Sequence, residues 1–154
     1  KKYLDILEAL YIVFVVRPFH DNIARAVLQT PKVYFYDTGL VVGDDGLRFE
    51  NLVATALHKQ VQWQHDAQGR ETGLHYIRTK DGAEVDFALS EQGQLTQLVE
   101  CKWSDNKPHR ALQRFAREQP QAKAVQVIRH LPHSHGLGEI EMVRADAFLN
   151  ALAA

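Results

Sequence analysis

Residues 82–103, Gly82-Ala-Glu-Val-Asp-Phe-Ala-Leu-Ser-Glu-Gln-Gly-Gln-Leu-Thr-Gln-Leu-Val-Glu-Cys-Lys-Trp103, decide the fold. Two segments of this stretch, 83–89 and 95–103, are rich in β-branched, leucine and aromatic residues, which favour strands. The residues between them, 90–94, include Gly93 and favour a turn. The stretch therefore predicts a β-hairpin.

Three charged residues interrupt the apolar pattern of this hairpin. Asp86 stands between Val85 and Phe87 in the first strand, and Glu100 and Lys102 are two residues apart in the second. Because side chains alternate along a strand, Glu100 and Lys102 project from one face. If the strands pair in register, Asp86 lies beside them, and two carboxylates and an ammonium converge.

This combination suits the hydrolysis of phosphodiesters. Mg²⁺ takes one or two carboxylates and keeps waters and phosphate oxygens as its other ligands, so Asp86 and Glu100 are candidate ligands for Mg²⁺ or Mn²⁺. Lys102 beside the ion would lower the pKa of an attacking water, orient that water, or stabilise charge that builds at the phosphate. The alternative is an exposed Glu–Lys pair, which contributes about a few tenths of a kcal/mol.

The composition is that of an ordinary globular protein. The chain has 154 residues, of which 45% are hydrophobic, and a formal net charge of -1, so charge alone does not indicate nucleic acid binding. The longest apolar run, residues 10–16, is too short to span a bilayer. The single cysteine, Cys101, excludes an internal disulfide and predicts a reducing, cytoplasmic location. We expect Cys101 to be a small buried hydrophobe rather than a nucleophile.

The elements expected before residue 46 are a helix and two strands. Residues 2–10 have apolar side chains at helical spacing, and residues 11–17 and 32–36 are β-rich. This order predicts a partial winged-helix segment over residues 1–45, followed by a second domain over residues 46–154. Because the chain opens on Lys1 rather than methionine, we expect it to be a fragment of a longer protein.

From residue 47 the expected elements follow the order α-β-β-β-α-β, which predicts an α/β fold with a mixed sheet. A helix over residues 47–60 precedes a polar stretch, 62–72, expected as a loop or strand edge. The strand over 124–129 follows a helix, so we expect it to pair in parallel with the Glu100 strand. The other elements are strands 74–79, 83–89, 95–103 and 139–143 and helices from about residue 109 and over 145–153.

Two other sets of residues have both a structural and a functional interpretation. Glu50 borders the apolar stripe of the first helix, where a glutamate in the first turn is favoured by the helix dipole. Arg110, Arg114 and Arg117 form a basic face that is either a solvated surface or a phosphate-contacting one. The His130, His133 and His135 cluster has spacing that suits zinc but lacks an evident fourth ligand.

Asp86 followed by Glu100-x-Lys102 on the next strand resembles the core motif of the PD-(D/E)XK nucleases, the restriction-endonuclease-like superfamily. The order α-β-β-β-α-β is the common core of that superfamily. Val85 stands where a proline often precedes the aspartate. The resemblance implies that Glu50, on the helix before the sheet, contributes to the metal site.

Four separated phrases look like DUF4143, a C-terminal domain that follows an AAA+ ATPase module in many bacterial and archaeal proteins. The resemblance implies a longer parent protein, whose ATPase is absent here because no Gly-x-x-x-x-Gly-Lys-Ser/Thr run occurs. Cys101 stands where many members carry valine. The phrases are Lys32-Val-Tyr-Phe-Tyr-Asp-Thr-Gly-Leu40, Phe49-Glu-Asn-Leu-Val53, Tyr76-Ile-Arg-Thr79 leading into Gly82-Ala-Glu-Val-Asp-Phe87, and Val99-Glu-Cys-Lys102.

Three functional hypotheses follow. The first is a Mg²⁺-dependent DNA endonuclease whose catalytic residues are Glu50, Asp86, Glu100 and Lys102. The second is a catalytically inactive module that binds nucleic acid or dimerises for the ATPase, and it is favoured by the near-neutral charge. The third is a partner-binding role in a toxin-antitoxin or defence system. We expect DNA and the ATPase domain of the same chain as partners and no membrane, and we leave a homodimer open.

Overall fold

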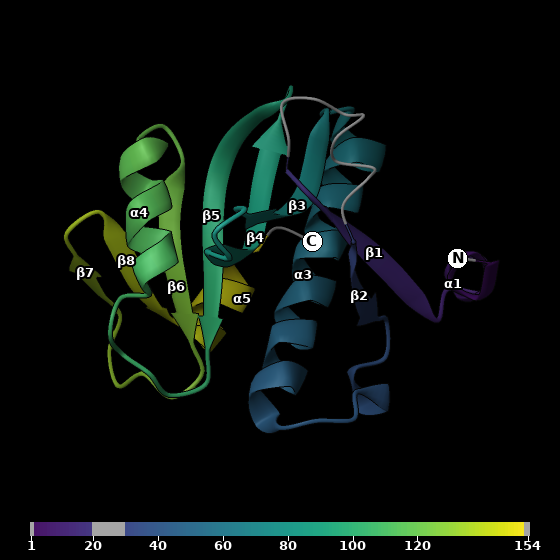
Figure 1. Cartoon of the computed structure of the whole chain (residues 1–154), viewed down its shortest axis with the longest axis horizontal. Helices are drawn as coiled ribbons and strands as arrows, with labels where there is room; N and C mark the ends of the chain where they lie inside the picture. Colours follow the sequence, from purple (N-terminus) through teal and green to yellow (C-terminus); the bar gives the residue numbers. More distant parts are fainter. Residues whose placement is uncertain (1, 20–29, 153–154) are drawn as a thin grey trace.

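The computed structural model describes residues 2–19 and 30–152, and within them an eight-stranded mixed sheet is combined with helices (Figure 1). The strand order is β2-β1-β3-β4-β5-β6-β8-β7. None of the helices in these ranges is long and apolar enough to cross a membrane. The elements are α1 (Lys2–Ala9), β1 (Val13–Pro18), β2 (Lys32–Phe35), the 3-10 helix η1 (Thr38–Leu40), α3 (Asp45–Gln68), β3 (Thr72–Arg78), β4 (Glu84–Glu91), β5 (Gln94–Lys102), α4 (Arg110–Glu118), β6 (Lys123–Ile128), β7 (His135–Leu137), β8 (Ile140–Arg144) and α5 (Ala145–Ala151).

The predicted hairpin forms the centre of the sheet. β4 and β5 pair antiparallel, and their connecting turn consists of Gln92 and Gly93, between the paired residues Glu91 and Gln94. Both turn residues have positive φ, 49° and 76°, as in the type I′ turns that match the twist of hairpin strands. β6 pairs in parallel with β5, which confirms the pairing predicted from the intervening helix.

One extra residue in β4 distorts its pairing with β3. Asp86 and Phe87 together face the single residue Tyr76, because the register shifts between the pairs His75↔Ala88 and Ile77↔Val85. Such a β-bulge redirects the side chains of the bulged strand, and bulges are frequent next to active sites. Asp86, the first candidate metal ligand, therefore lies at an irregular point of the sheet.

Two apolar clusters lie on opposite faces of β5. Val99 belongs to the cluster that contains side chains of α3 and α5, whereas its neighbour Leu98 belongs to the cluster that contains side chains of α4. Alternation along the strand then places Glu100 and Lys102 on the face of Leu98, and Cys101 lies with Val99 in the α3 cluster. Each face of the central strand is thus covered by helices.

The order of elements expected from residue 47 is present as α3, β3, β4, β5, α4 and β6. The interpretation of residues 62–72 was wrong in part, because α3 continues to Gln68. Its last two turns lie largely in solvent, so their polar side chains show no apolar periodicity. The helix ends at the C-cap residue Gly69, which has a left-handed φ of 64°. Its backbone N–H donates to the carbonyls of Gln64 and His65.

β1 and β2, from the segment expected to belong to a winged helix, extend this sheet on the side away from α4 (Figure 1). β1 pairs antiparallel with β2 and in parallel with β3 at Arg17 and Pro18. Phe14, Val16 and Tyr34 share the apolar cluster of α3. Residues on both sides of position 45 therefore pack in one core. Most of the connection expected between the two strands, residues 20–29, lies outside the described residues.

Asn51 of α3 binds the outer backbone of the edge strand β2. Asn51 is only 3% exposed. Its side-chain amide accepts a hydrogen bond from Phe35 N at 2.8 Å and donates one to Phe35 O at 2.9 Å. The same Nδ2 donates to Thr38 Oγ1 at 3.1 Å. The amide thus takes the place of a neighbouring strand and fixes β2 beside Glu50, the residue before Asn51.

We predict that Asn51→Ala lowers the free energy of unfolding by about 1–3 kcal/mol, because Phe35 N loses its acceptor and Phe35 O keeps only the longer contact with Thr55 Oγ1, at 3.3 Å. Chemical denaturation measures this loss. Gln62→Ala, an exposed position on the same helix, is the matched control and is expected to change little. Equal losses in the two variants would contradict this account of the strand edge.

Candidate functional site

The β4–β5 ladder opens next to the bulge, and two carboxylates bridge the opening. The last regular pair at this end is Phe87 with Val99. Beyond it, the backbone N–H of Asp86 donates to Glu100 Oε2 at 3.3 Å, and that of Cys101 donates to Asp86 Oδ2 at 3.0 Å. Each carboxylate therefore binds the backbone of the opposite strand, and the structure brings Asp86 and Glu100 together.

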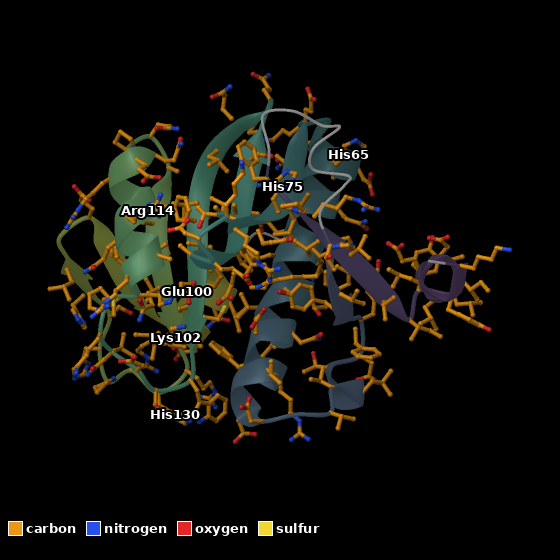
Figure 2. The ribbon with its side chains drawn as sticks, viewed as in Figure 1. His65, His75, Glu100, Lys102, Arg114 and His130 are labelled. Atoms are coloured by element: carbon orange, nitrogen blue, oxygen red, sulfur yellow. The ribbon has the colours of Figure 1, made fainter. Side chains whose placement is uncertain are left out.

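Glu100 is almost completely buried, and Lys102 is its cationic partner (Figure 2). Lys102 Nζ lies 2.6 Å from Glu100 Oε1. Burial, aided by the negative charge of Asp86, raises the pKa of Glu100 to about 7 against the opposing effect of Lys102. Burial disfavours the ammonium of Lys102, but the hydrogen bond and charge of Glu100 outweigh it and raise the pKa of Lys102. Lys102 is thus an ammonium at neutral pH.

Glu50 is connected to this pair through two residues that the sequence analysis did not select, Lys32 and Tyr34. Tyr34 Oη donates to Glu50 Oε1 at 2.6 Å. Lys32 Nζ lies 3.3 Å from the same oxygen and 3.2 Å from Asp86 Oδ1. Lys32 and Tyr34 are two residues apart on β2, so their side chains project from the same face. This spacing is the signal for the pair that the sequence contains. Nothing local in the sequence shows that this face meets Asp86.

A buried glutamine positions the loop after β5. Gln126, fully buried in β6, accepts from His109 N at 2.9 Å and donates to the carbonyls of Lys107 and Asp105 at 2.9 and 3.2 Å. The His109 ring then approaches Glu100, with Nδ1 3.1 Å from Oε1 but not aligned for a hydrogen bond. Burial and the charge of Lys102 lower the pKa of His109, so its ring is neutral at pH 7.

The predicted arginine face lies on the exposed side of α4, but two of its members already bind carboxylates. Arg114 lies 3.0 Å from Asp81 and 2.8 Å from Glu118, and Figure 2 shows it on α4 near β5. Arg117 Nε lies 3.9 Å from Glu139. Part of the basic charge is thus offset by neighbouring acidic side chains, whereas Arg110 is exposed.

Among residues 2–19 and 30–152, no group of three or more His, Cys, Asp or Glu side chains is arranged to hold a metal ion. The His130 ring packs edge-on against Trp103, with 4.8 Å between ring centroids. Asp86 and Glu100 remain as a pair of hard oxygen donors, and one or two carboxylates are what Mg²⁺ uses while it keeps its waters. The chemistry of the pair therefore fits Mg²⁺ or Mn²⁺. Cys101 is buried, and burial raises the pKa of its thiol.

We predict that Glu100→Gln is more stable than the native protein above pH 7 by about 2 kcal/mol. The pKa of Glu100 rises from 4.5 to about 7 on folding, so its stabilising proton is fully bound below about pH 4.5 and is lost as the pH rises through 7. The glutamine mimics the protonated form at every pH. Chemical denaturation with EDTA between about pH 4.5 and 8.5 measures the difference.

The matched control for this prediction is Glu71→Gln, an exposed position on the same protein. It is expected to leave the pH dependence of stability unchanged. A pH profile of Glu100→Gln that runs parallel to that of the native protein would contradict the assignment of this titration to Glu100.

The chain matches two protein-family models. Residues 45–141, more than half of the chain, match "Domain of unknown function (DUF4143)", and residues 1–48 match "Domain of unknown function (DUF8612)". No curated protein and no solved structure matches the chain significantly. The first match includes Glu50, Asp86, Glu100 and Lys102, and the second includes Lys32 and Tyr34. The chain therefore belongs to the DUF4143 family, whose description assigns no function.

Proposed function

We propose that this chain is a nuclease domain of the restriction-endonuclease-like superfamily that hydrolyses phosphodiester bonds of DNA with Mg²⁺ or Mn²⁺. The observation that carries the proposal is the convergence of Asp86 and Glu100 where the β4–β5 ladder opens, with Lys102 Nζ 2.6 Å from Glu100. The order α3, β3, β4, β5, α4, β6 agrees with the core of that superfamily. The spacing of Asp86 and Glu100-x-Lys102 on adjacent strands agrees with its motif.

Each site residue has a distinct role in this proposal. Asp86 and Glu100 would hold the metal ion, which on binding polarises the phosphate and lowers the pKa of a bound water. Lys102, an ammonium held by Glu100, stabilises negative charge that develops on the phosphate oxygens. Its raised pKa favours this electrostatic role over that of a proton acceptor. Glu50, held by Tyr34, orients the Lys32 ammonium on the Asp86 side of the site.

The proposal includes a larger protein around this domain. The resemblance of four sequence phrases to a domain that follows AAA+ ATPase modules supports an ATPase in the same parent chain. DNA is the proposed substrate, and the α4 arginines are its proposed contacts. Arg110 and Arg114 would then exchange solvent or carboxylate contacts for phosphate.

The distribution of charge favours a second candidate function, a module that binds nucleic acid without cleaving it. The net charge is -1, and Arg114 and Arg117 are offset by Asp81, Glu118 and Glu139. Phosphate binding usually relies on clustered lysine and arginine. Cleavage and retention of DNA distinguish the two functions.

We predict that the protein cleaves plasmid DNA or oligonucleotides in Mg²⁺ or Mn²⁺ and that Asp86→Asn and Lys102→Met each reduce the rate by about 100-fold or more. The first variant removes a metal-binding charge, and the second removes the ammonium without shortening the side chain. Gel electrophoresis of the products measures the rate. Asp66→Asn and Lys59→Met, both exposed on α3, are charge-matched controls expected to cleave normally.

Undiminished cleavage by Asp86→Asn would contradict the assigned site. If the native protein retains DNA in a gel-shift assay but cleaves none under any of these conditions, the binding module is the better account.

A further inference from the structure

Lys32 is surrounded by three carboxylates, one from α3 and two from β4. Its Nζ lies 2.7 Å from Glu84 Oε1, 3.2 Å from Asp86 Oδ1 and 3.3 Å from Glu50 Oε1. An ammonium has three N–H donors, so these three oxygens match its hydrogen-bonding capacity. The side chain is 17% exposed. Lys32 is thus a largely enclosed cation whose partners include two candidate site residues.

The fold brings Lys32 to Asp86 although β2 lies three places from β4 in the strand order. The hairpin of β1 and β2 joins β3 at Arg17 and Pro18, and its inner face packs on the α3 cluster. The Tyr34 ring consequently lies 5.5 Å from that of Phe87 on β4. The hairpin folds across the sheet in this way, and Lys32 reaches over the Tyr76 ring, 5.6 Å from its centroid, to Asp86.

The contact pattern of Asp86 shows what Lys32 does to the site. Oδ2 accepts the backbone N–H of Cys101, and Oδ1 contacts Lys32. A divalent cation bound by Asp86 through Oδ1 would meet the ammonium at the same oxygen. Like charges at such separations repel strongly in a partly enclosed site. The divalent cation and the Lys32 ammonium therefore cannot both bind Asp86 Oδ1 without weakening each other's contact.

Resting on the proposed function, we infer that Lys32 is a positioning residue that acts as an internal counter-cation and competes with the divalent cation for Asp86. Without metal, its ammonium offsets the repulsion among Glu50, Glu84 and Asp86 and holds them together. With metal, Lys32 must yield the Asp86 oxygen. The lysine therefore sets how tightly the site binds a divalent cation, and Glu84 provides the partner on which Lys32 stays anchored.

The test is direct binding of Mn²⁺, without DNA, to the native protein and to Lys32→Met, by isothermal titration calorimetry and by the EPR signal of free Mn²⁺. We expect Lys32→Met to bind Mn²⁺ about tenfold more tightly or better, because a competing positive charge is removed. Its melting temperature in EDTA should fall, since Glu50 and Asp86 lose their counter-cation, whereas Glu84 keeps Arg78. Lys32→Gln, whose amide still donates to carboxylates, serves in its place if Lys32→Met does not fold.

Two controls separate charge at this position from charge elsewhere. Lys32→Arg keeps the cation and should bind Mn²⁺ like the native protein. Lys59→Met removes an exposed lysine of α3 and should also leave the affinity unchanged.

The outcomes distinguish this inference from the proposed function. If the native protein binds Mn²⁺, Asp86→Asn abolishes binding and neither neutral Lys32 variant binds more tightly, competition by Lys32 is overturned while the metal site stands. If neither the native protein nor any Lys32 variant binds Mn²⁺, even with DNA present, both the inference and the metal-dependent function are overturned.

Discussion

The crossed hydrogen bonds that the Asp86 and Glu100 carboxylates accept from the backbone of the opposite strand are the constraint on which the rest of the structure depends. They replace the β4–β5 ladder beyond its last regular pair, Phe87 with Val99, next to the bulge in the β3–β4 pairing. Two carboxylates at 15% and 3% side-chain exposure are costly to bury, because each loses most of its hydration. Backbone N–H groups, Lys102 and Lys32 offset that cost, so neighbouring elements must supply these groups in register.

Buried polar residues make those connections. Asn51 joins α3 to β2 and thereby brings Lys32 and Tyr34 to Glu50. Gln126 joins β6 to the loop after β5 and thereby brings His109 to Glu100. The two apolar clusters cover these polar contacts on either side of the sheet. Because each connection starts from a residue that is 3% exposed or less, loosening one of them should disturb the site as well as the fold.

The sequence predicted what depends on local patterns. Alternation and Gly93 identified the hairpin, the helix between β5 and β6 indicated their parallel pairing, and the phrases around Asp86 and Glu100 indicated the DUF4143 family. The bulge at Asp86 could not be predicted from the sequence because it depends on how β4 pairs with β3. The contact of Lys32 with Asp86, 54 residues away in sequence, depends on how a hairpin folds across the sheet. The solvated end of α3 lacked an apolar stripe by which to recognise it.

The most direct test of the central claim, that the opened ladder is a cation site, is anomalous X-ray scattering from crystals of this protein grown with Mn²⁺. The account predicts a manganese peak between the carboxylates of Asp86 and Glu100, with the Lys32 ammonium moved away from Asp86 Oδ1. Crystals in which the crossed hydrogen bonds and the Lys32 contact persist, and manganese binds elsewhere or nowhere, would contradict it.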